Sequence, residues 1–159
     1  MKQVDKVDIA IMDRLQQNGR LTNAKLAVEL SLSETPCWRR LKSLEEEGFI
    51  EGYQANLNRK KLGFGVMAFV QLTFIKHDVE ITETFEAIIQ SSANVLSCYN
   101  TTGEADFMLQ VVAKDLDDYS RFVERVLRKL PGVSIISSNI SLRELKSSSR
   151  LPITSSSYG

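Results

Sequence analysis

Hydroxyl and cationic side chains between residues 33 and 43 recur at spacings that place them together on a helix. Thr35, Arg39 and Lys42 follow one another at steps of four and three residues, so at about 100° per residue they share one face. Such groups contact base edges and phosphates in the major groove of DNA. We therefore interpret the second of two short helices in the segment 22–48, the one that Ser33 begins, as a DNA-recognition helix, with residues 33–43 in the major groove. The candidate contacts are Arg39 and Lys42 as the principal ones, Ser33, Thr35, Pro36 and Ser43 beside them, and Asn23, Lys25 and Arg40 near phosphates.

The same spacing also fits an ordinary helical hairpin with a solvated charged face. Three glutamates at positions 45–47 lie at the far end of the recognition helix. The phosphates of DNA would repel their negative charges. Contact with DNA should therefore be confined to the first two or three turns. Spacing alone leaves both interpretations open.

A second group of cations follows the helical region. Arg59, Lys60 and Lys61 are adjacent and come after the segment 49–57, which favours extended structure. They fit a second phosphate contact beside a short wing or linker strand, and they equally fit a solvated linker.

Three helices should position the recognition face. Residues 5–18 carry apolar side chains at steps of three and four, and Gly19 closes the helix. Thr22 and Ser33 are suitable N-caps for two further short helices, and Pro36 falls in the first turn of the last one. We expect a shared core of Val4, Val7, Ile11, Leu15, Leu26, Leu30, Leu32, Cys37, Leu41 and Leu44.

From residue 65 the hydrophobic periodicity changes, and the pattern predicts a second domain. Its order is strand, helix, strand, strand, helix, strand, which is the split β-α-β or ferredoxin-like arrangement of an α+β fold. The predicted elements are a strand at 66–75, a helix at 82–90, strands at 95–101 and 107–113, a helix at 115–130 and a strand at 133–145.

The strands also carry apolar residues on the face that the two helices do not cover. Phe69 and Ile75 are examples, and a face in contact with water needs few such residues. We therefore expect a second subunit to cover the sheet and form a homodimer.

Composition excludes several other classes of protein. The formal charge is zero, with 11 Lys/Arg against 9 Asp/Glu in residues 1–62, so DNA binding must depend on a local patch. No apolar run is long enough to span a bilayer, and the N-terminus lacks a signal-peptide pattern.

The two cysteines, Cys37 and Cys98, are far apart in the sequence and fit free thiols of a reducing cytosol. His77 is the sole histidine and we expect it on a solvated loop, which predicts neither a metal site nor a catalytic one.

Five short motifs make the chain resemble the Lrp/AsnC, or feast/famine, family. They are Asp5-x-x-Asp8, Asn18-Gly19-Arg20, Thr35-Pro36-Cys37, Leu44-Glu45-x-x-Gly48-x-Ile50 and Arg150-Leu151-Pro152-Ile153. The resemblance implies a bacterial or archaeal transcriptional regulator of amino-acid metabolism or transport, acting in the cytoplasm at the nucleoid. It further implies a winged helix-turn-helix domain at 1–48, a wing or linker strand at 49–64, an effector-binding and oligomerisation domain, called RAM, at 65–146, and a partly flexible tail at 147–159.

The resemblance also implies an amino-acid effector, bound between dimers that assemble into octamers. The family's ligand loop usually contains Gly-Asp-Tyr-Asp, and residues 103–106 occupy its place here. Ala105 replaces the aromatic residue, which leaves the identity of the effector open. The expected effector-binding residues are Thr101, Thr102, Gly103, Glu104, Ala105, Asp106, Ser137 and Ser138.

Three other interpretations remain open. Residues 103–106 also fit a plain hairpin turn. A DNA-architectural regulator without an effector would carry the same two domains. Some proteins of this architecture act in tetrapyrrole decarboxylation, although no group of acid and base residues here predicts an enzyme. We expect a DNA-binding regulator with no cofactor.

Overall fold

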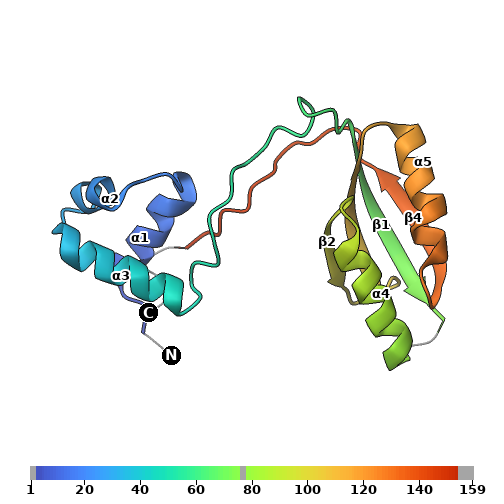
Figure 1. Cartoon of the computed structure of the whole chain (residues 1–159), viewed down its shortest axis with the longest axis horizontal. Coiled ribbons are helices and arrows are strands. Elements are labelled where there is room, and N and C mark those ends of the chain that lie inside the picture. The colour runs from blue at the N-terminus through green and yellow to red at the C-terminus, as the bar shows by residue number, and fades with distance from the viewer. Residues whose placement is uncertain (1–2, 76–77, 154–159) are drawn as a thin grey trace. The chain divides into compact units, whose positions relative to one another are not determined.

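The chain divides into two structural units. The computed structural model describes residues 3–75 and 78–153, so the predicted loop position of His77 lies outside the described residues. One unit comprises the described residues up to Asn56 together with residues 146–153, and the other is Leu57–Leu145 (Figure 1).

The first unit is a bundle of three helices, α1 (Lys6–Gln17), α2 (Asn23–Glu29) and α3 (Glu34–Glu46). Asp5 begins α1 with a capping box, in which its carboxylate accepts from the backbone N–H of Asp8 and the Asp8 carboxylate accepts from that of Asp5. The predicted core is confirmed in its main members. The buried residues are Ile11, Leu15, Leu26, Ala27, Cys37 and Leu44, with Val7, Leu30, Leu32 and Leu41 partly buried against them.

Two local predictions between residues 33 and 64 differ from the structure. Ser33 occupies the N-cap position of α3, but its hydroxyl makes no capping hydrogen bond, whereas the Thr22 hydroxyl accepts from Lys25 N at 3.3 Å. Residues 49–64 form no strand, because nothing in the described part of the chain pairs with them as a neighbouring strand. Hydrogen bonds within local turns satisfy some of the backbone N–H and C=O groups of this segment instead. One example is Phe64 N, which donates to Arg59 O at 2.8 Å.

The second unit has the predicted ferredoxin-like order. The elements are β1 (Val66–Phe74), α4 (Val79–Ser91), β2 (Val95–Asn100), β3 (Phe107–Ala113), α5 (Leu116–Arg125), η1 (Leu127–Lys129) and β4 (Val133–Ile140). The antiparallel sheet has the strand order β2-β3-β1-β4, and α4 and α5 pack on one face. The last strand ends at Ile140 rather than Leu145, and a 3₁₀ turn, η1, follows the end of α5 at Arg125.

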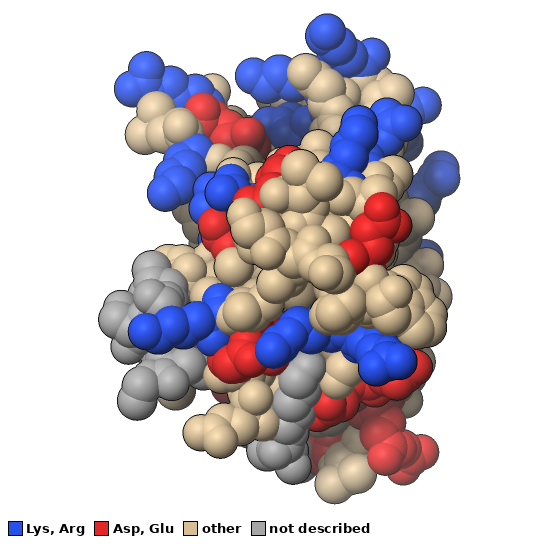
Figure 2. All heavy atoms as spheres, turned by 90° about the vertical axis from the view of Figure 1, so that its left-hand side faces the viewer, with Lys and Arg blue, Asp and Glu red and all other residues tan. Residues whose placement is uncertain are grey.

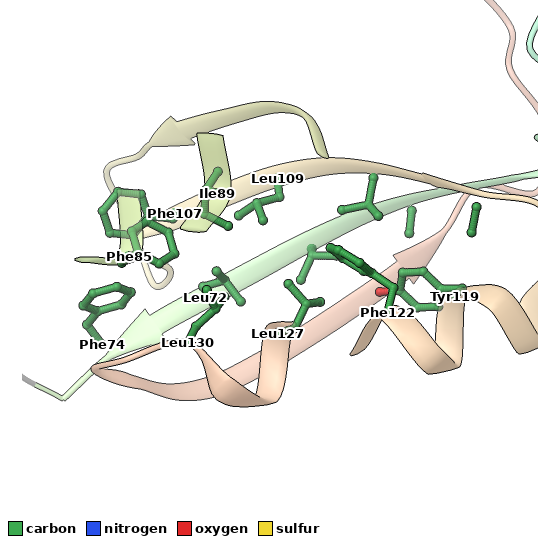
Figure 3. Packing of buried hydrophobic residues seen from close by; sticks show 14 residues of the cluster. Leu72, Phe74, Phe85, Ile89, Phe107, Leu109, Tyr119, Phe122, Leu127 and Leu130 are labelled. Atoms are coloured by element: carbon green, nitrogen blue, oxygen red, sulfur yellow. The ribbon is translucent and has the colours of Figure 1, made fainter. Parts of the chain in front are cut away.

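Three phenylalanines close one end of this core. The rings of Phe74, Phe85 and Phe107 lie with their centroids 4.7 to 5.1 Å apart (Figure 3). Such tilted and edge-to-face contacts add to the stabilisation from burial. Because Phe107 begins β3, this cluster anchors the chain immediately after the loop at residues 103–106.

Gly132 is required by the turn before β4. Its φ is +76°, and an added Cβ would lie 2.6 Å from Cγ2 of Ile81 and 3.2 Å from Phe74. We expect Gly132→Ala to destabilise the second unit by about 2–4 kcal/mol, through backbone strain and overpacking together. Gly63→Ala is the control, since Gly63 also has a positive φ (+88°) but its new methyl group would meet no described atom within 4 Å. Urea unfolding followed by circular dichroism should show the larger loss for Gly132→Ala, and equal losses would contradict the steric argument.

Candidate nucleic-acid interface and ligand pocket

Helix α3 presents the predicted recognition face to solvent. Cys37 and Leu44 are buried in the core, whereas Thr35, Pro36, Arg39 and Lys42 are at least partly exposed. The helix buries one stripe because its apolar residues recur at helical spacing, and the polar residues then point away from the bundle. This face is therefore open to a partner.

The exposed polar groups differ in how firmly they are held. Lys42 Nζ lies 3.6 Å from Glu45 Oε2, and the Ser43 hydroxyl donates to Glu47 Oε1 at 2.9 Å. Arg39 has no ion pair within the described chain. Figure 2, which views the left-hand side of Figure 1, shows Lys and Arg side chains separated by uncharged residues and by Asp and Glu, without a continuous basic surface. Binding energy for DNA must therefore come from particular contacts rather than from bulk charge.

Arg40 holds α3 to the start of α1. Its Nη1 atom lies 2.6 Å from Asp5 Oδ2 and 2.9 Å from Asp8 Oδ1, and the Asp8 side chain is only 1% exposed. Hydrogen bonds to the two carboxylates raise the pKa of Arg40, and the Asp8 backbone N–H together with Arg40 lowers the pKa of Asp5. The sequence predicts the Arg40 guanidinium near phosphates, whereas in the structure it binds two carboxylates of the helical bundle.

The lowered pKa of Asp5 predicts a pH dependence of the first unit. The stabilisation by the Asp5 carboxylate is fully present above the ordinary pKa of aspartate and is lost as the pH falls through the lower, folded-state value. The effect should stay below about 1 kcal/mol, because the side chain is half exposed. Asp5→Asn keeps an N-cap and removes this ionisation. Thermal melts followed by Trp38 fluorescence from pH 7 to about pH 3 should show the wild-type advantage over Asp5→Asn disappearing, and a constant difference would contradict it.

The other predicted phosphate contacts divide into two groups. Asn23 Nδ2 donates to Glu34 O at 3.0 Å and so joins the starts of α2 and α3. Arg59 donates to Phe64 O at 2.8 Å and closes its own loop. Lys25, Lys60 and Lys61 are exposed.

A hollow of about 670 Å³ lies beside the loop at residues 103–106. Gln71 on β1 and Met108 on β3 are direct neighbours across the sheet and alternate with the buried core residues, so they lie on the face away from the helices. The lining comprises four of the predicted effector-binding residues, Thr101, Thr102, Glu104 and Ala105, together with Gln71, Asn100 and Met108.

The remaining predicted effector residues do not line this pocket. The Asp106 carboxylate accepts from Phe74 N at 2.7 Å and so ties the end of β1 to the loop. Ser138 accepts from the Tyr119 hydroxyl at 2.6 Å, which places it on the helix side of the sheet. Ser137 pairs with Gln71 on the pocket side. Gly103 supplies the turn, with a φ of +114°.

Sequence reasoning missed Gln71, Asn100 and Met108. The alternation of β1 and β3 predicts which face Gln71 and Met108 occupy, but only strand register brings them next to each other. The register pairs Gln71 with Met108 on one side and with Ser137 on the other. A pocket built across several strands is not visible in any single segment.

Other site types find no support in the described part of the chain. No group of three or more His, Cys, Asp or Glu residues there could hold a metal ion. Cys37 and Cys98 are free, and burial raises the pKa of each thiol, which disfavours the reactive thiolate. None of the described helices has the length and apolar character needed to cross a membrane.

Comparison with known protein families matches two domains along the chain. The Lrp/AsnC ligand binding domain matches residues 67–151, and a winged helix-turn-helix DNA-binding domain matches residues 4–51. Together these matches include both the exposed face of α3 and the pocket beside the loop.

Curated relatives are similar over nearly the whole chain. The Bkd operon transcriptional regulator of Pseudomonas aeruginosa is 37% identical, over 96% of this chain and 100% of its own length. The leucine-responsive regulatory protein of Salmonella typhimurium is 34% identical, over 96% of this chain and 93% of its own.

Solved structures share the fold. A transcriptional regulator of Neisseria meningitidis, solved as a complex with L-Met, superposes with a TM-score of 0.89 at 39% identity, covering 93% of this chain and 96% of that one. AsnC of Escherichia coli, at 20% identity and a TM-score of 0.84, agrees in fold over 94% of this chain and 99% of its own.

Proposed function

The chain belongs to the Lrp/AsnC family of DNA-binding transcriptional regulators, and from this premise we propose how its residues bind DNA and sense a small molecule. The family's function is DNA binding and control of transcription rather than catalysis. The observation that carries the proposal is the exposed face of α3, where Thr35, Arg39 and Lys42 project from a helix packed on its opposite side.

We propose that the first turns of α3 enter the major groove. Arg39 contacts a base or phosphate directly, and Lys42 exchanges its weak pairing with Glu45 for a phosphate. Arg40 is assigned a supporting role, because its guanidinium is already bound to Asp5 and Asp8. Lys25, Lys60 and Lys61 supply further cations near the backbone of the duplex.

Dimerisation of the second unit would link two such helices. Phe69 is 41% exposed, Ile135 59% and Tyr99 63%, all on strands of the sheet whose other face packs against α4 and α5. A second copy covering this face would remove these apolar groups from water. Two linked DNA-binding units then bind paired half-sites far more tightly than either alone. Further assembly of dimers into octamers is part of the same proposal.

An amino acid is the proposed effector, bound in the pocket beside residues 103–106. Glu104 is the only charged residue among the described residues of the lining, and its carboxylate suits an ammonium group. The small side chain of Ala105 leaves room for the effector's own side chain. The L-Met complex of the Neisseria meningitidis regulator supports this class of ligand. An effector can shift assembly, and thereby operator binding, only as far as it prefers one assembly over another.

A thermal-shift screen with the twenty amino acids tests the effector proposal. At least one amino acid should raise the melting temperature, and Glu104→Gln should weaken its binding about ten- to hundredfold, because a charge-assisted hydrogen bond is lost. Glu83→Gln removes an exposed carboxylate of α4 outside the pocket lining and should leave binding unchanged. If no amino acid shifts the melting temperature, the effector proposal fails and a DNA-architectural role replaces it.

A further inference from the structure

The C-terminal segment, residues 146–153, is bound to the DNA-binding unit rather than to the sheet domain that it follows. Its backbone is held on α1 by a single glutamine. The Gln16 side chain accepts from Leu151 N at 2.6 Å and donates to Leu151 O at 3.2 Å. One side-chain amide thus satisfies both backbone groups of Leu151, as a neighbouring strand would.

An ion pair lies one turn away on the same helix. Arg150 Nη2 is 2.7 Å from Asp13 Oδ1, and residues three apart on a helix project to the same side. Pro152 restricts Leu151 to extended backbone, which is the conformation that presents its N–H and C=O to Gln16. Ile153 is partly buried, although Leu151 itself is 64% exposed. Gln16 and Asp13 therefore bind the backbone of Leu151 and the charge of Arg150, and the apolar side chain of Leu151 contributes little.

Docking of this segment gives the DNA-binding unit a second connection to the other unit, which is held at α1 by hydrogen bonds and an ion pair. The chain leaves the first unit between Asn56 and Leu57 and returns to it between Leu145 and Lys146. A unit held at both points samples fewer orientations than one held at a single linker. The contacts are also weak enough to open, since the Arg150 and Asp13 side chains are 49% and 30% exposed.

We propose that the outward face of α1 at Asp13 and Gln16 is a docking site for the Arg150–Ile153 segment of the same chain, and that reversible docking controls binding to paired half-sites. Docked segments restrict both DNA-binding units of a dimer and raise the effective concentration of the second unit at its half-site. Undocking lowers that concentration without altering α3. The control of DNA binding rests on the proposed function, whereas the docking itself does not.

Hydrogen exchange of the Leu151 amide, followed in the full chain by NMR, tests docking without DNA. The amide should be protected in the wild type, and Gln16→Ala and Arg150→Glu should each accelerate its exchange about tenfold. The double variant Asp13→Arg/Arg150→Glu restores the ion pair with its charges exchanged and should regain protection. Wild-type exchange at the rate of an unstructured peptide would overturn the docking site.

Duplexes selected from a random-sequence pool by the wild-type protein test the control of DNA binding. Arg150→Glu and a chain ending at Lys146 should bind a duplex with two half-sites about tenfold more weakly, and a duplex with one half-site equally well. The charge-exchanged double variant should recover the loss. Unchanged affinity of the shortened chain for two half-sites would overturn the regulatory role. If the wild type retained no duplex at all, the proposed function would fail, and the exchange measurement would still decide the docking.

Discussion

Arg39→Ala should weaken operator binding by about 1–3 kcal/mol, while the melting temperature of the protein stays unchanged. Arg39 lies on the exposed side of α3, and its guanidinium has no ion pair in the described structure, so the fold loses nothing when it is removed. In the complex, the same group is the one on this face best suited to bidentate contact with a guanine edge or a phosphate.

Gel-shift titration against selected duplexes measures this loss, with Arg125→Ala as the control. Arg125 ends α5, so the control removes an equal charge from a residue that does not belong to the helix-turn-helix unit. A base contact should also relax specificity at one position of the operator, whereas a phosphate contact should weaken all sequences alike and reduce the salt dependence. Unchanged affinity of Arg39→Ala would remove this residue from the interface.

Arg40→Ala should have the opposite result, a loss of stability rather than of direct DNA contact. Without Arg40, the Asp8 carboxylate stays buried and loses the cation that lies 2.9 Å from it. Removing one member of a buried ion pair costs several kcal/mol, and we expect about 2–3 kcal/mol here because the Arg40 side chain is 35% exposed and water can reach the site.

Trp38 offers a direct measurement, since it is the only tryptophan of the chain and lies on α3. Its fluorescence during urea unfolding reports the free energy of unfolding of the first unit. The double variant Asp8→Asn/Arg40→Ala removes both charges of this pair and should regain most of the lost stability. If Arg40→Ala is as stable as the wild type, the bridge to α1 contributes nothing, and a phosphate contact becomes the better role for Arg40.

Periodicity along the chain was sufficient to predict the elements and their order. The α1 core residues at steps of three and four, and the alternation in β1, are local properties because side-chain direction follows directly from backbone geometry. The change of period near residue 65 likewise separated a helical unit from an α+β unit. Secondary structure was predicted less well for segments whose backbone hydrogen bonds depend on a neighbouring strand. Residues 49–64 favour extended structure, yet they form no strand because an extended segment needs a neighbour for its hydrogen bonds.

The roles of individual polar residues depended on tertiary contacts. Arg39 and Arg40 are identical in type and adjacent in sequence, and only the approach of α1 decides that one is solvent-exposed and the other bound to two carboxylates. Glu104 and Asp106 diverge in the same way, since the Asp106 carboxylate accepts from Phe74 N while Glu104 lines the pocket.

By itself, the sequence determined the two domains, the exposed face of α3 and the position of the loop at residues 103–106, because helical and strand periods and turn residues act within a few positions of one another. The tertiary structure alone decided which cations have partners, that Gln71 and Met108 complete the pocket, and that the C-terminal segment lies on α1 at Gln16. The contact between Gln16 and Leu151 joins residues 135 positions apart, and no local pattern specifies the partner of a polar group across such a separation.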